Sequence, residues 1–137
     1  MSENDNFGIA DNSYQAAGGL PGLTRLSDAF YQYMDTLPEA KTVRDMHKGD
    51  LAESRKKLAF FLSGWLGGPK LYSENFGSIR IPLAHKHLPI GREEVEAWLL
   101  CMKKAVDEQP YSQSFKIYLI EQLRVPAERI LGACNKA

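Results

Sequence analysis

Apolar residues recur at helical spacing in four long stretches of the chain, over about 22–36, 50–66, 92–108 and from about 112 onward. Positions three and four residues apart share one face of a helix, so each stretch predicts an amphipathic helix with one apolar side. No segment shows the regular alternation of apolar and polar residues that is typical of a strand. The sequence therefore predicts an all-α protein.

Glycine and proline mark the expected helix ends. The glycines at 18–19 close a short helix over about 13–17, and those at 67–68 end the helix over about 50–66. Pro126 falls within the fourth pattern. It predicts a kink or a restart there, because proline lacks the amide donor and clashes with the preceding turn.

The connection from Gly67 to Gly91 is long and rich in glycine and proline, so we expect no long regular element in it. A connection of more than about 15 irregular residues in a compact domain is usually functional. It contains His85 and His87, two of the three histidines of the chain. Histidine is a common ligand of haem iron, but two histidines on a loop are also an ordinary surface feature. The motif alone leaves both interpretations open.

The composition narrows the class of protein. A chain of 137 residues favours one domain, here 13–137, preceded by a flexible polar extension over 1–12. Seventeen Lys and Arg residues balance seventeen Asp and Glu residues, which argues against a nucleic-acid or anionic-membrane partner. No apolar run is long enough to cross a bilayer and the first residues do not resemble a signal peptide, so we expect a cytoplasmic protein.

Several short motifs stand together in a recognisable order. They are Gly18-Gly19, Phe30-Tyr31, the run 61–72 around Gly67-Gly68-Pro69, and the run 97–102 that contains Trp98. In this order and with these gaps, the chain resembles the group II truncated haemoglobins from about Gly18 into the fourth helix. The resemblance implies a two-over-two α-helical sandwich around haem b (iron protoporphyrin IX). It also implies that an extended loop replaces the proximal helix of a globin, in agreement with the irregular connection.

The resemblance places the proximal iron ligand at His85, thirteen residues before Trp98. His87 is a rival ligand, because it stands where the family often has proline. The family also often has arginine at the position of Ala84, where it helps to bind a haem propionate. The resemblance then leaves this role to Arg80, Tyr72 or Lys57.

On the distal side, the resemblance implies a polar pocket for the gaseous ligand. Tyr31 is expected to donate a hydrogen bond to that ligand, with His47 and Trp98 beside it. On the residues alone, Tyr31 and Trp98 could equally be core side chains, and His47 a solvated loop histidine. Whether the resting iron takes Tyr31, His47 or water as its sixth ligand stays open. Ser54 and Leu58 are expected to face the ligand, and the other expected haem contacts are Phe30, Met46, Phe61, Leu88, Ile90 and Met102.

These residues favour a haem protein that binds dioxygen and other diatomic ligands for storage, supply or sensing. A haem enzyme acting on peroxide or nitric oxide is the alternative, because a polar pocket also stabilises charge on a splitting O–O bond. A haem-free helical interaction module is a third hypothesis. The haem interpretations also imply an electron-donating reductase as a partner, and we expect a monomer or a weak dimer.

Overall fold

The computed structural model describes residues 7, 9–45, 51–76 and 91–134, except for the side chains of residues 130 and 132–134. Within these ranges the chain is helical and contains no strand, so the all-α prediction is confirmed. The elements in chain order are α1 (Asn12–Ala16), α2 (Gly19–Thr36), the 3-10 helix η1 (Pro38–Ala40), α3 (Lys41–Asp45), α4 (Ala52–Trp65), α5 (Leu71–Phe76), α7 (Arg92–Asp107) and α8 (Gln113–Cys134).

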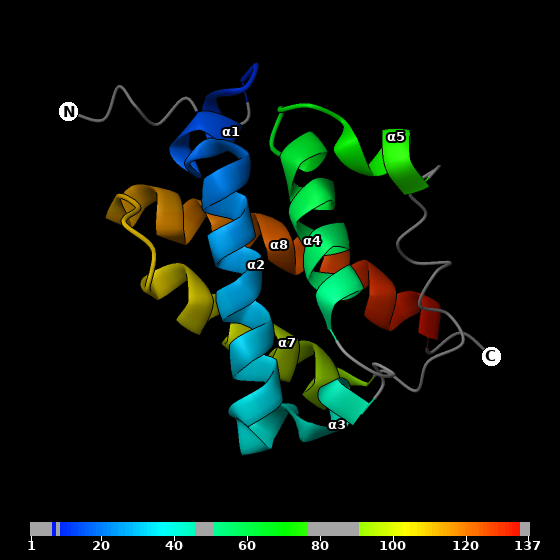
Figure 1. The fold of residues 1–137 in the computed structure, drawn as a ribbon. Coiled ribbons are helices and arrows are strands. Elements are labelled where there is room, and N and C mark those ends of the chain that lie inside the picture. Colours follow the sequence, from blue (N-terminus) through cyan, green and yellow to red (C-terminus); the bar gives the residue numbers. More distant parts are fainter. Residues whose placement is uncertain (1–6, 8, 46–50, 77–90, 135–137) are drawn as a thin grey trace.

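The four long helices form two crossed pairs. Figure 1 shows α2 and α4 side by side, with α7 and α8 crossing behind them. Helix α2 contacts both α4 and α7, and α7 in turn packs on α8. This is the two-over-two arrangement that the resemblance implied.

Helix α2 is central because one stripe of it is fully apolar. Leu23, Leu26, Phe30 and Met34 recur at spacings of three and four, and all four are buried. Burying an apolar side chain of this size stabilises the fold by about 1.5–3 kcal/mol. The burial of this stripe therefore stabilises the packing of α2 against α4 and α7.

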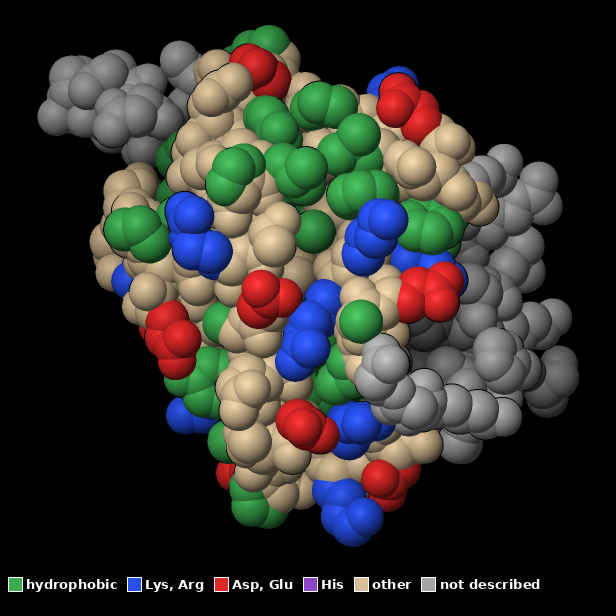
Figure 2. Space-filling view, in the orientation of Figure 1, with side chains coloured by type: hydrophobic (Ala, Val, Ile, Leu, Met, Phe, Trp, Pro, Cys, Tyr) green, Lys and Arg blue, Asp and Glu red, His purple; other side chains and the backbone are tan. Residues whose placement is uncertain are grey.

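The end of α4 is shaped by two glycines that α1 and its preceding turn cover. Gly67 has a φ of 93°, and a Cβ there would lie 2.1 Å from the Ala10 carbonyl oxygen. At Gly68 a Cβ would lie 2.4 Å from the Tyr14 ring. The expected stop at 67–68 is thus confirmed, because only glycine allows both the positive φ and these close approaches. On the face in Figure 2, hydrophobic side chains gather where α1 meets this end of α4.

The expected restart at Pro126 was wrong. Helix α8 runs from Gln113 through Pro126 to Cys134 without a break. Proline removes one backbone hydrogen bond, but Leu119, Leu123 and Ala127 on the same helix are buried. Their burial offsets the local cost and keeps the helix continuous.

Candidate functional site

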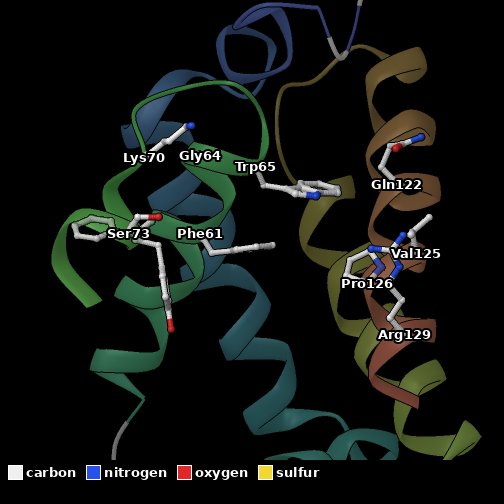
Figure 3. A pocket seen from close by; sticks show the side chains of 11 residues that line it. Phe61, Gly64, Trp65, Lys70, Ser73, Gln122, Val125, Pro126 and Arg129 are labelled. Carbon is white, nitrogen blue, oxygen red and sulfur yellow. The ribbon is translucent and has the colours of Figure 1, made fainter. Parts of the chain in front are cut away.

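A cavity of about 490 Å³ lies between α4 with α5 on one side and α8 on the other. Figure 3 shows Phe61 and Trp65 extending from α4 toward α8, where Val125, Pro126 and Arg129 form the opposite wall. The walls are mainly aromatic and aliphatic, with a few polar groups at the edges. The lining residues are Phe60, Phe61, Gly64, Trp65, Lys70, Tyr72, Ser73, Gln122, Val125, Pro126 and Arg129.

The α4 wall comes from a regular stripe of that helix. Ser54, Leu58, Phe61 and Trp65 follow one another at spacings of four, three and four residues, so they lie on one face. The rings of Phe61 and Trp65 are stacked, with centroids 6.1 Å apart and planes inclined by 21°. Both rings extend from α4 toward α8 and border the cavity.

The α8 wall is also a helical stripe. Gln122, Val125, Pro126 and Arg129 recur at i, i+3, i+4 and i+7 and are separate from the buried positions of the helix. Val125 is 47% exposed, a large fraction for a valine in a helix that packs on the core. It remains accessible because it faces the cavity.

A buried tyrosine lies at the interface of α2 and α4. Tyr31 is 7% exposed, and its ring meets the edge of the Phe30 ring at 4.8 Å between centroids. Phe30 in turn contacts the half-buried Trp98 of α7, with ring centroids 5.1 Å apart. The three aromatic residues therefore form one cluster across α2 and α7.

Burial raises the pKa of the Tyr31 phenol to about 12, and a hydrogen bond with Ser54 and the charge of Arg55 offset part of this rise. The desolvated phenolate is the less stable form, so the group stays neutral and keeps its proton at physiological pH. Ser54 belongs to the same α4 stripe as Phe61. The Tyr31 hydroxyl and the cavity are therefore associated with one face of α4.

The structure brings six of the expected site residues that it describes into two sets. Tyr31, Ser54, Phe30 and Trp98 form the aromatic and polar cluster, while Phe61 and Tyr72 line the cavity.

Three other expected site residues occupy different surroundings. Leu58 packs partly buried against the core, and Met102 is fully buried in it. Lys57 forms an ion pair with Glu53 at 3.2 Å, and its ammonium lies 5.3 Å from the centre of the Phe76 ring.

The remaining expected site residues lie outside the described residues, so their assigned roles stay predictions. They are His85, His87, His47, Met46, Arg80, Leu88 and Ile90.

Sequence reasoning missed the α8 wall. The spacing of Gln122, Val125 and Arg129 was a usable signal, but the stripe is polar at both ends and does not read as an apolar face. Trp65 fits the apolar side of α4, and helical spacing alone does not distinguish a core side chain from one that lines a cavity. Lys70 follows the helix stop at 67–69 and carried no signal of its own.

Among the described residues, no helix has both the length and the apolar character needed to cross a membrane.

Comparison with known proteins agrees with this architecture. The model of the family described as bacterial-like globin matches residues 12–129. The group 2 truncated hemoglobin YjbI of Bacillus subtilis (strain 168) is 32% identical over 126 residues, which cover 92% of this chain and 93% of the relative.

Solved structures show the same fold. The cold-adapted truncated hemoglobin of the Antarctic marine bacterium Pseudoalteromonas haloplanktis TAC125 superposes with a TM-score of 0.85 at 29% identity, covering 91% of this chain and 98% of that one. The group II 2-on-2 hemoglobin of the plant pathogen Agrobacterium tumefaciens gives 0.82 at 34% identity, covering 95% and 97%. A truncated oxygen-avid haemoglobin from Bacillus subtilis gives 0.79 at 33% identity, covering 87% and 98%.

The matched family model spans most of the chain, and these relatives share its order of helices over nearly their whole length. The chain therefore belongs to the bacterial-like globin family, as a group II truncated haemoglobin.

Proposed function

We propose that this globin binds haem b in the cavity between α4 and α8 and uses it to bind dioxygen. Membership of the globin family implies haem binding in general. The observation that carries the finer proposal is the buried, protonated Tyr31 hydroxyl of α2, which is hydrogen-bonded to Ser54 on the α4 face that also carries Phe61 of the cavity wall. The Bacillus subtilis relative is an oxygen-avid truncated haemoglobin, which supports the choice of gas.

The cavity fits a flat, largely apolar cofactor with two acidic groups. Its volume of about 490 Å³ lies in the range of about 300–1,000 Å³ that is typical of ligand and cofactor pockets. Phe61 and Trp65 extend from α4 toward α8 and supply two aromatic rings that can contact a macrocycle. Lys70 and Arg129 supply positive charge at the edges, which suits carboxylates.

When bound, haem supplies an iron that coordinates small diatomic gases reversibly. We assign the proximal ligation to His85, on the sequence resemblance described above. Phe61, Trp65 and Tyr72 would hold the macrocycle from the α4 and α5 side, and Val125 and Pro126 from the α8 side. These apolar contacts also exclude water, which strengthens any hydrogen bond made inside the pocket.

We assign to Tyr31 the hydrogen bond to a partly negative gas ligand, because its buried phenol is paired with Ser54 of the α4 face that also carries Phe61. Its high pKa keeps the proton on the phenol, and Ser54 fixes the hydroxyl by a hydrogen bond of its own. The Phe30 ring holds the Tyr31 ring in place from its edge. A hydrogen bond to a charged group is worth about 1.5–3 kcal/mol, which is enough to slow release of dioxygen.

The absorption spectrum of the purified protein with stoichiometric hemin tests the proposal. We expect a Soret band in the ferric form and, after reduction, separate spectra for the dioxygen and carbon monoxide complexes. His85→Ala should lose stable haem, or bind it only with added imidazole, while His87→Ala should retain the wild-type spectrum. If His87→Ala loses haem and His85→Ala does not, the ligand assignment is wrong by two residues. A wild-type protein without a Soret band would overturn the whole proposal.

A further inference from the structure

Two cations line the cavity, and neither forms an ion pair with any residue that the structure describes. They are Lys70, which precedes α5, and Arg129 on α8. Several other basic side chains of the described chain are paired with carboxylates. These are Lys41, Arg44, Arg55, Lys57, Arg92, Lys103 and Arg124.

Arg129 contrasts with its neighbour on the same helix. Arg124 contacts Glu96 at 3.0 Å and Glu128 at 3.5 Å, on the side of α8 that meets α7. Arg129 instead continues the stripe of Val125 and Pro126 that faces Phe61 and Trp65. Its guanidinium thus lies at the edge of an apolar slot without an anionic partner among the described residues.

We propose that Arg129 binds a propionate carboxylate of the haem. This inference rests on the haem site proposed above. It assigns the carboxylate contact to α8, a helix in which no sequence motif predicted a haem contact. A guanidinium presents a planar fork of N–H donors that fits a carboxylate with two parallel hydrogen bonds.

The alternatives that the structure describes are weaker, and Arg80 lies outside the described residues. Lys57 already has Glu53 as a partner and does not line the cavity. Tyr72 lines it but carries no charge to match a carboxylate. The stem of Lys70 lies against Gly64, at the other end of the cavity from Arg129 in Figure 3.

The rate of haem loss from the full-length reconstituted protein tests the assignment. Ferric haem would be transferred to an excess of apomyoglobin and followed by absorbance, once with hemin and once with hemin dimethyl ester, whose propionates carry no charge. Arg129→Gln should accelerate loss of hemin by about three- to tenfold, the scale of a charge-assisted contact at a partly exposed site. Loss of the dimethyl ester should proceed at the same rate in Arg129→Gln and wild type.

Three further variants make the result specific. Arg129→Lys should recover part of the difference between hemin and its ester, because the charge returns without the fork. Arg124→Gln is the matched control on α8 and should leave both rates unchanged. Lys70→Gln tests the rival cation of the cavity.

The possible outcomes separate this inference from the proposed function. Equal acceleration of both haem forms by Arg129→Gln would show a structural role and overturn the inference, as would no acceleration at all. An ester-dependent effect in Lys70→Gln without one in Arg129→Gln would move the carboxylate contact to Lys70. If the wild-type protein took up neither hemin nor its ester, the proposed function itself would fail.

Discussion

Helix α4 has two sides with opposite characters. Toward α2 it presents Ala59, Leu62 and Ser63, which are 3%, 0% and 0% exposed. Toward α8 it presents Phe61 and Trp65, which are half-buried and border a cavity of about 490 Å³. Neighbouring residues of one helix therefore have different roles. The closed side contributes to the stability of the fold, and the open side keeps apolar surface free for a ligand.

The largest expected effect separates these two sides through neighbouring residues. Leu62→Ala should lower the free energy of unfolding by about 2–5 kcal/mol, because it leaves a void in a packed interior. This loss should be similar with and without hemin. Phe61→Ala should cost less without hemin and more with it, because a ligand that binds only the folded state adds its binding free energy to stability.

Urea unfolding of both variants, each measured with and without hemin, gives the four values needed. An identical response of Leu62→Ala and Phe61→Ala to hemin would contradict the division of α4 into a structural and a binding side.

Tyr31, a buried residue of α2 beside α4, makes stability depend on alkaline pH. The folded-state pKa of Tyr31, about 12, lies above its ordinary value of 10.0. A raised pKa means that the folded state holds the proton more tightly, so this contribution to stability is complete below about pH 10 and falls as the pH rises toward about 12. At about 1.4 kcal/mol per pKa unit, the loss reaches about 3 kcal/mol.

In Tyr31→Phe, stability should fall less steeply over roughly pH 9–12, measured by urea unfolding. Tyr111 also has a pKa raised to about 12 by burial and remains in the variant, so part of the slope persists. Ser54→Ala should raise the pKa of Tyr31 further, because its hydrogen bond lowers that pKa. A titration followed at the tyrosinate absorbance would show this directly. An unchanged alkaline slope in Tyr31→Phe would contradict the burial argument.

A third prediction concerns how the buried Tyr31 hydroxyl serves the open side. If the Tyr31 hydroxyl stabilises bound dioxygen by roughly 1.5–3 kcal/mol, Tyr31→Phe should accelerate its release by about ten- to a hundredfold. Release of carbon monoxide should change much less, because its outer atom carries less charge. Trp98 could replace the lost donor, so the double variant Tyr31→Phe with Trp98→Phe is measured beside the single one. Wild-type release rates in both would remove the donor role assigned to these residues.

The difference between the two sides also explains how far the sequence could be interpreted. The predicted helices over about 22–36 and 50–66 are confirmed, as is the all-α class, but the apolar residues of the second helix divide between the closed and the open side. The short motifs around Phe30-Tyr31, Gly67-Gly68 and Trp98 pointed to the family that the comparisons show.

The open side was less visible in the sequence. Its α8 wall combines Gln122, Val125, Pro126 and Arg129, a mixture whose lining role depends on where α8 stands relative to α4. Pro126 even suggested a break, because local proline chemistry was weighed without the burial of Leu119 and Leu123 on the same helix. The position of α8 in the folded protein determines both its lining role and its continuity through Pro126. The sequence pattern alone does not contain that position.

The smallest expected effect lies on the outer surface, where α7 meets α8. Arg92 and Arg124 form ion pairs with Glu96 and Glu128, and all four side chains are well exposed to solvent. Exposed ion pairs contribute little because water and salt screen them. Arg124→Gln should therefore unfold at a urea concentration within experimental scatter of wild type, and the remaining difference should vanish at high salt.

This network has one measurable signature. Arg124 lowers the pKa of Glu96, and Arg92 that of Glu128, by hydrogen bonding to the carboxylates. A lowered pKa in the folded state gives stability that is present above the ordinary carboxyl pKa and is lost as the pH falls through the lowered value. Arg124→Gln should move the pKa of Glu96, followed by NMR of its side-chain carboxyl, back toward the ordinary range while Arg129→Gln leaves it in place. If both variants moved the pKa of Glu96 equally, Arg124 and Arg129 would not lie on separate faces of α8. The distinction between the exposed ion-pair network and the cavity wall would then be wrong for this helix.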